Sequence, residues 1–254
     1  RRQRQMCIRD SFIGVFMGEY VDNFKECLPD QKLVKEIKKD LESKGVKYIY
    51  SNWIDFLGSP KTKPMPISDF EDLCAGKGPQ FAVHSVSFVP ELTPADNDQI
   101  PVPDLDSLVI CPWDKSCAWV FADLWWNDKP YDVCPRQTLK KQIKKNAEAD
   151  LKYYVGIEPE FFVMKWEDGK PVKAIDNDPI PLRRQAFGYD SEYSIDGMNF
   201  LKEIIDILNN DLHWDLHDVV AEGAYGQYEL DFGYTDMLGT VSYTHLRAHE
   251  TPRH

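Results

Sequence analysis

Two acidic residues within one apolar run constrain the fold of this chain more than any other feature. The run GIEPEFFV (156–163) has the composition of a buried β-strand. Residues i and i+2 of a strand share a face, so Glu158 and Glu160 would lie roughly 7 Å apart and repel by about 2–3 kcal/mol at an effective dielectric near 20. Pro159 lacks a ladder donor and predicts an edge, a bulge or a local opening. Placing both carboxylates on one strand face lowers stability unless a cation, a base or solvent lies between them. The alternative is a strand end with two solvated acids.

A second acidic group occurs in AEGAYGQYELDF (221–232), at Glu222 and Glu229. Apolar residues alternate with acids at its end, which predicts a strand that carries Glu229 on one face. If this hairpin pairs with the GIEPEFFV strand, three or four carboxylates converge, and unpaired carboxylates cannot share a pocket as bare charges. All-oxygen ligation suits Mg²⁺ or Mn²⁺ rather than zinc. Acids that hold such ions commonly position nucleotide phosphates for phosphoryl transfer.

Charge and hydropathy exclude several classes of function. A formal net charge of −12 argues against a general nucleic-acid binder. No apolar run approaches a membrane span, and no secretory signal is visible, so we expect no membrane partner. The six cysteines form no CxxC pair and are expected to be reduced thiols in a cytoplasmic protein.

The two ends differ in composition from the rest of the chain. RRQRQMCIRDS (1–11) and VSYTHLRAHETPRH (241–254) resemble translated sequencing-adapter read-through and are set aside as foreign segments. The arginines at the start imitate a nucleic-acid arm, and His245 and His249 imitate a helical zinc pair. We expect neither function.

Between these ends, periodicity separates two regions. Residues 12–132 combine helices with several β-prone segments and predict a small, mostly β domain, and the pattern changes before a second region at 133–240. Helices are expected at 31–45, 64–73, 136–151 and 198–210, strands at 46–58, 117–126 and 156–163, and a strand–loop–strand at 213–234.

Other candidate motifs carry no chemistry. CAGKGPQF (74–81) lacks the spacing of a phosphate-binding loop and is predicted to be a turn. His213 and His217 fit a strand better than a metal-binding helix, and we expect Cys111 and Cys117 to lie too far from any histidine or acid partner to act as nucleophiles. No catalytic side chain is therefore nominated.

Two motifs indicate a family. G-x-E-P-E-F-F (156–162), and G-Q-Y-E-L-D (226–231) preceded by Glu222, resemble the metal-binding signatures of the glutamine synthetase superfamily. YSNWIDFLG (50–58) and the stretch from PWDKSCAW to RQTLKK (112–141) resemble its early strand and its domain junction. In detail the chain looks most like the branch of γ-glutamylmethylamide synthetase and related amine ligases.

The resemblance implies an α+β fold, with a β-grasp N-terminal domain at 12–132 and a catalytic domain, at 133–240, whose antiparallel strands form an incomplete barrel. It implies an ATP-dependent ligase that transfers the γ-phosphoryl group of ATP to the γ-carboxylate of glutamate. An amine, here methylamine or a similar alkylamine, then attacks the acyl phosphate. Family enzymes assemble as homo-oligomeric rings with active sites between subunits.

The resemblance also implies site residues. Glu160, Glu222 and Glu229 would hold one Mg²⁺ or Mn²⁺ near the substrate glutamate, and Glu158 would hold a second ion that bridges the phosphates of ATP. Tyr234 lies five residues after Glu229, where family members have an ATP-contacting aromatic residue.

The chain departs from the family pattern at two places. Ala82 stands where much of the family has an aspartate that helps to bind ammonium, which favours an alkylamine over ammonia. The family-like sequence stops near Thr240, before further ligands and arginines, so we expect a truncated and inactive fragment of an active parent. An ammonia-using glutamine synthetase and a non-catalytic structural or sensing member are the alternatives.

Overall fold

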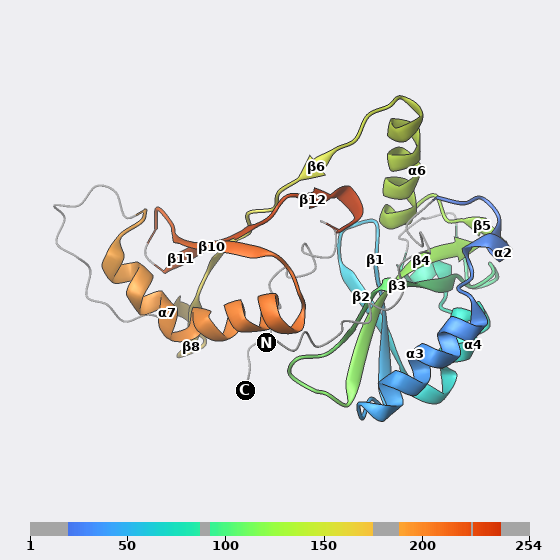
Figure 1. Cartoon of the computed structure of the whole chain (residues 1–254), viewed down its shortest axis with the longest axis horizontal. Coiled ribbons are helices and arrows are strands. Elements are labelled where there is room, and N and C mark those ends of the chain that lie inside the picture. The colour runs from blue at the N-terminus through green and yellow to red at the C-terminus, as the bar shows by residue number, and fades with distance from the viewer. Residues whose placement is uncertain (1–19, 87–91, 175–187, 225, 240–254) are drawn as a thin grey trace, which may run out of the picture. The chain divides into compact units, whose positions relative to one another are not determined.

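The computed structural model describes residues 20–86, 92–174, 188–224 and 226–239 (Figure 1). It contains two compact units, one that reaches Lys152 and one that begins at Tyr153. The adapter-like segments 1–11 and 241–254, with His245 and His249, lie outside the described residues. No helix in the described part of the chain is long and apolar enough to cross a membrane.

The first unit is built on a mixed sheet with the strand order β2-β1-β4-β3, and β5 pairs with β4. β1 and β4 are parallel, and the other pairs are antiparallel. The strands are β1 (Tyr48–Ile54), β2 (Pro60–Pro66), β3 (Ile100–Ile110), β4 (Cys117–Trp126) and β5 (Lys129–Pro130). The helices are α2 (Phe24–Cys27), α3 (Gln31–Ser43), the 3₁₀ turn η1 (Ile67–Asp69), α4 (Phe70–Cys74), α5 (Val83–Val86) and α6 (Pro135–Glu148).

Helix α3 covers one face of this sheet, as its apolar periodicity predicts. The side chain of Asp30 accepts hydrogen bonds from the first turn of the helix, at 2.8 and 3.0 Å, and so caps it. Val34, Ile37 and Leu41 are buried in one cluster with residues of β1, β2 and β4. The helix ends before Gly45, whose φ of +90° is in the left-handed region.

Strand β2 corrects the sequence prediction. We expect a helix from residue 64, but PKTKPMP forms a strand, and β1 is its only partner among the described strands. Proline lacks a ladder donor and is tolerated at a sheet edge, which is where β2 lies.

By packing, the chain divides into its two units after Lys152. Helix α6 belongs to the first unit because two of its basic residues are buried against that sheet. Arg136 pairs with Asp104 and Asp123, and Lys140 also pairs with Asp123. Buried charges persist only when they are paired, so these contacts fix the helix to β3 and β4.

The second unit combines a small antiparallel sheet with one long helix. Its sheet has the order β10-β11-β7, and two ribbons, β12-β6 and β8-β9, accompany it. The strands are β6 (Tyr154–Val155), β7 (Glu160–Phe162), β8 (Met164–Glu167), β9 (Lys170–Lys173), β10 (Leu216–Ala221), β11 (Gln227–Phe232) and β12 (Thr235–Asp236). Helix α7 (Ser191–Asp206) continues into the π-helical turn η2 (Ile207–Asp211).

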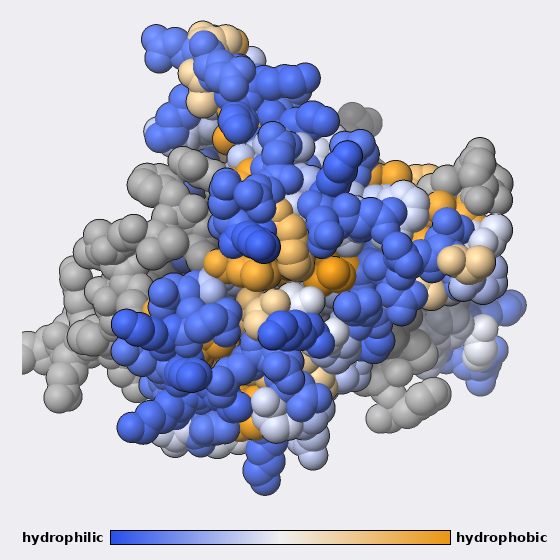
Figure 2. Space-filling view, turned by 90° about the vertical axis from the view of Figure 1, so that its right-hand side faces the viewer, coloured by the Kyte–Doolittle hydropathy of each residue, from blue (hydrophilic) through white to orange (hydrophobic). Residues whose placement is uncertain are grey.

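Helix α7 packs against one face of that sheet (Figure 1). Tyr193 and Leu201 are buried together with Ala221 of β10 and Tyr228 of β11. Gly197 allows the close approach, because a Cβ there would lie 2.4 Å from the ring of Tyr228. In the view of Figure 2, hydrophilic residues cover most of the described surface.

Candidate metal centre

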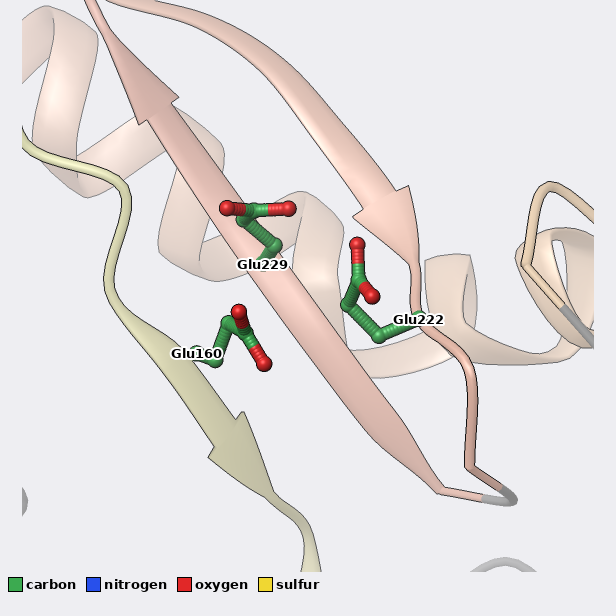
Figure 3. Close-up of side chains that lie close together, drawn as sticks. All are labelled: Glu160, Glu222 and Glu229. Carbon is green, nitrogen blue, oxygen red and sulfur yellow. The ribbon is translucent and has the colours of Figure 1, made fainter.

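Strand pairing gathers three carboxylates on one face of the second unit. The register of β7 against β11 places Glu160 directly opposite Glu229. The pairing of β10 with β11 extends one step beyond β10, where the backbone N–H of Glu222 donates to the carbonyl of Gln227 at 3.0 Å. One oxygen from each of Glu160, Glu222 and Glu229 lies within 4.8 Å of the others. Figure 3 shows these carboxylates pointing toward one another from two strands and the loop after β10.

The opposite face of β11 explains why the acids are held there. Tyr228, Leu230 and Phe232 alternate with the acids and are buried, with 2%, 5% and 6% of their surfaces exposed. The hydroxyl of Tyr228 donates to the backbone carbonyl of Tyr193 on α7, at 3.2 Å. Because successive strand residues point to opposite faces, burying this apolar row commits Glu229 to the other face.

A tight connection brings Glu222 to the same place. Gly226 has a φ of +77°, which favours glycine, and the N–H of Gln227 donates to the carbonyl of Ala224 at 3.0 Å. The chain therefore reverses within a few residues of Glu222 and enters β11 two residues before Glu229.

Burial and the closeness of neighbouring carboxylates raise the pKa values of two acids on β11. Partial burial, then a hydrogen bond with Glu222 and the charges of Asp231, Glu222 and Glu160, raise the pKa of Glu229 to about 7. The pKa of Asp231 is also raised, first by burial and then by Glu158 and further acids. A divalent cation would offset this repulsion, and the oxygen-only donor set suits Mg²⁺ or Mn²⁺. These residues therefore fit such an ion.

Glu158 lies outside this group of three. The predicted strand 156–163 is regular only at Glu160–Phe162, and Glu158 precedes it in an irregular segment. The carbonyls of Ile157 and Pro159 still accept hydrogen bonds from β11, at 3.3 and 3.2 Å. This places Glu158 near Asp231, whose pKa it helps to raise.

Tyr234 lies just after β11, with 81% of its surface exposed. Its ring borders Gly156, where an added Cβ would come within 2.9 Å of the ring. The glycine of the GIEPEFFV motif thus leaves room for an exposed aromatic side chain.

Gln227 is a further residue of this site that was not predicted from the sequence. Its side-chain amide donates a hydrogen bond to Glu160. The signal was present in the spacing, because Gln227 lies two residues before Glu229 on the same strand face.

Comparisons with known proteins agree with these features. The family described as the catalytic domain of glutamine synthetase matches residues 132–246. A glutamine synthetase of Rhizobium meliloti is 32% identical over 198 residues, which are 78% of this chain and 43% of that protein. A glutamate–methylamine ligase of Methyloversatilis universalis is 27% identical over 208 residues, covering 80% of this chain and 45% of the ligase.

Solved structures point the same way. The complex of GmaS with ADP matches with a TM-score of 0.70 and 28% identity, over 82% of this chain and 46% of that one. GmaS without ligand matches with the same TM-score and 27% identity. The chain spans less than half the length of the curated relatives cited here.

Proposed function

We propose, from the premise that the chain belongs to the glutamine synthetase superfamily, that its protein is an ATP-dependent ligase that joins the γ-carboxylate of glutamate to an amine. The observation that carries the proposal is the convergence of Glu160, Glu222 and Glu229 on one sheet face. Acids clustered without a partner reduce stability, so a structural role gains nothing from them. A site that binds divalent cations does gain from them, because carboxylate oxygens are the ligands that such cations prefer.

The site residues take the following roles in the proposal. Glu160, Glu222 and Glu229 hold one Mg²⁺ or Mn²⁺, and Glu158 contributes to a second. When bound, these ions supply the positive charge that offsets the negative charge of phosphoryl transfer. The sheet positions the carboxylates, because their side chains project from a backbone held by strand pairing. The apolar side chains of the sheet that pack on α7 hold it further.

The reaction proceeds in two displacements. An oxygen of the γ-carboxylate of glutamate attacks the γ-phosphorus of ATP, and the bond to ADP breaks. The amine nitrogen then attacks the acyl carbon, the bond to phosphate breaks, and the amine loses a proton. The exposed ring of Tyr234 beside Gly156 offers a flat surface to the nucleotide, and ADP is bound in one similar solved structure.

A methylamine-like alkylamine is the proposed co-substrate. Similarity to a glutamate–methylamine ligase supports it, as does Ala82 in place of an ammonium-binding aspartate. Ammonia is the second candidate, favoured by the 32% identity to a glutamine synthetase.

The proposal extends to the fold, the location and the assembly of the protein. We propose that the N-terminal region is a β-grasp domain, supported by a mixed sheet that packs on α3. We also propose that the catalytic strands form part of an incomplete barrel, and that the protein works in the cytoplasm as a homo-oligomeric ring.

ADP release tests the proposed reaction. The whole protein should release ADP only when glutamate, Mg²⁺ and an amine are present together, with methylamine, ethylamine and ammonia assayed side by side. ADP release that is unchanged when every amine is omitted would refute the ligase assignment. A preference for ammonia would refute only the alkylamine.

A further inference from the structure

Gln227 contacts the elements that carry all three carboxylates of the metal centre. Its backbone carbonyl accepts the N–H of Glu222 at 3.0 Å, and its side-chain Nε2 donates to Oε2 of Glu160. It also begins β11 and shares a strand face with Glu229. One residue thereby links three ligands that come from separate parts of the chain.

The hydrogen bond to Glu160 has a defined chemical effect. Glu160 is solvent-exposed, so its side chain would otherwise sample several rotamers, and ordering it for a cation would cost conformational entropy. An ionised carboxylate only accepts hydrogen bonds, so the amide N–H is the group that can hold it. The donor is neutral and leaves the negative charge of Glu160 intact. A lysine here would compete with a cation for that charge.

We infer that Gln227 is a positioning residue, which holds the carboxylate of Glu160 in the orientation that a bound cation requires; the inference rests on the proposed metal centre. Residues that orient metal ligands typically change metal affinity by about 10–100-fold when they are replaced. Gln227 performs this role through Glu160 and is not itself assigned as a ligand.

The test measures Mn²⁺ affinity of the 254-residue chain by electron paramagnetic resonance of free Mn²⁺. Gln227→Met keeps the length of the side chain and removes the donor, and it should weaken Mn²⁺ binding by about 10-fold or more. Gln142→Met is the matched control, because Gln142 also donates a side-chain hydrogen bond, to Asn146, but lies on α6 of the first unit. It should bind Mn²⁺ as the wild type does.

Repeating the substitution in a Glu160→Asp variant distinguishes a residue that orients Glu160 from one that only stabilises the fold. Glu160→Asp shortens the carboxylate beyond the reach of the amide, so adding Gln227→Met to it should weaken Mn²⁺ binding no further. A structural role would weaken both backgrounds equally and would overturn the inference. Gln227→Asn, whose amide is one methylene too short, replaces Gln227→Met if that variant does not fold.

The remaining outcomes are distinguishable. A wild-type chain that binds Mn²⁺ and a Gln227→Met chain that binds it equally well would overturn the inference and leave the metal centre standing. A wild-type chain that binds no Mn²⁺ would overturn the metal centre and, with it, the inference.

Discussion

Replacing Glu229 by glutamine tests whether repulsion among the three carboxylates lowers the stability of the metal-free chain and is offset when a cation binds. Glutamine has nearly the same shape but no charge, so the variant removes the repulsion of Glu229 by Glu160 and Glu222, whose nearest ligand oxygens lie within 4.8 Å. Two unit charges about 5 Å apart interact by about 1 kcal/mol in bulk water and about 3 kcal/mol at an effective dielectric of 20. Because these side chains are partly exposed, we expect Glu229→Gln to stabilise the metal-free chain by about 1 kcal/mol.

The stabilisation should depend on pH. Burial and then the neighbouring acids raise the pKa of Glu229 from 4.5 to about 7. The folded chain therefore binds more protons than the unfolded chain between these values, and its stability falls as the pH rises through 7. The advantage of Glu229→Gln should be absent below about pH 4.5, where Glu229 is neutral in both states, and complete above about pH 7.

Calorimetric unfolding in EDTA near pH 4.5 and near pH 8 measures this difference. Adding Mn²⁺ at about 100 times its dissociation constant should stabilise the wild type by about 2.7 kcal/mol and Glu229→Gln much less, which reverses the order of stability. Glu203→Gln on the exposed side of α7 is the control and should change neither value. The reasoning is refuted if Glu229→Gln is less stable than the wild type in EDTA at the higher pH.

Proton release and two packing contacts give further tests. Mn²⁺ affinity should rise from about pH 6 to about pH 8 because Glu229 must lose its proton to bind a cation, and titration calorimetry in buffers of different ionisation enthalpy should detect that proton; a flat profile would contradict this. Gly197→Ala should lower the free energy of unfolding in urea by about 1–2 kcal/mol, since its Cβ would clash with the buried ring of Tyr228; an unchanged value would count against the packing described here. Arg136→Met should cost about 3–5 kcal/mol because it leaves the buried carboxylate of Asp104 without its closest partner, and wild-type stability in urea would show that the pairing is dispensable.

Local patterns predicted the parts of the fold that depend on one segment. Alternation in YELDF correctly placed Tyr228 in the core and Glu229 on the opposite face, because period-two burial needs only the strand itself. The apolar stripe of α3 likewise specified both the helix and its buried face.

Features that depend on distant partners could not be predicted. The register that sets Glu160 opposite Glu229 joins residues far apart in sequence, and no local pattern specifies which strands pair. Helix α7 begins at Ser191, earlier than the predicted start at residue 198. Gly197 disfavours a helix when the sequence is taken alone, and only its close contact with Tyr228 explains why a glycine stands there. The burial of Arg136 was also hidden, since charged residues are ordinarily exposed unless a partner is present.

The hydrogen bond from Gln227 to Glu160 also depends on a partner that is distant in sequence. A polar residue on an exposed strand face usually contacts solvent, and only the pairing of β7 with β11 gives this one a ligand to hold. The sequence therefore specified the acids, and the tertiary register specified how they are arranged.

The central claim is that Glu160, Glu222 and Glu229 form one cation site. Titration of the chain with Mn²⁺, followed by electron paramagnetic resonance, tests it most directly. The wild-type chain should show a saturable Mn²⁺ site that Glu160→Gln and Glu222→Gln each abolish or greatly weaken, while Glu203→Gln retains it. Absence of saturable binding in the wild type, or undiminished binding in both carboxylate variants, would contradict the claim.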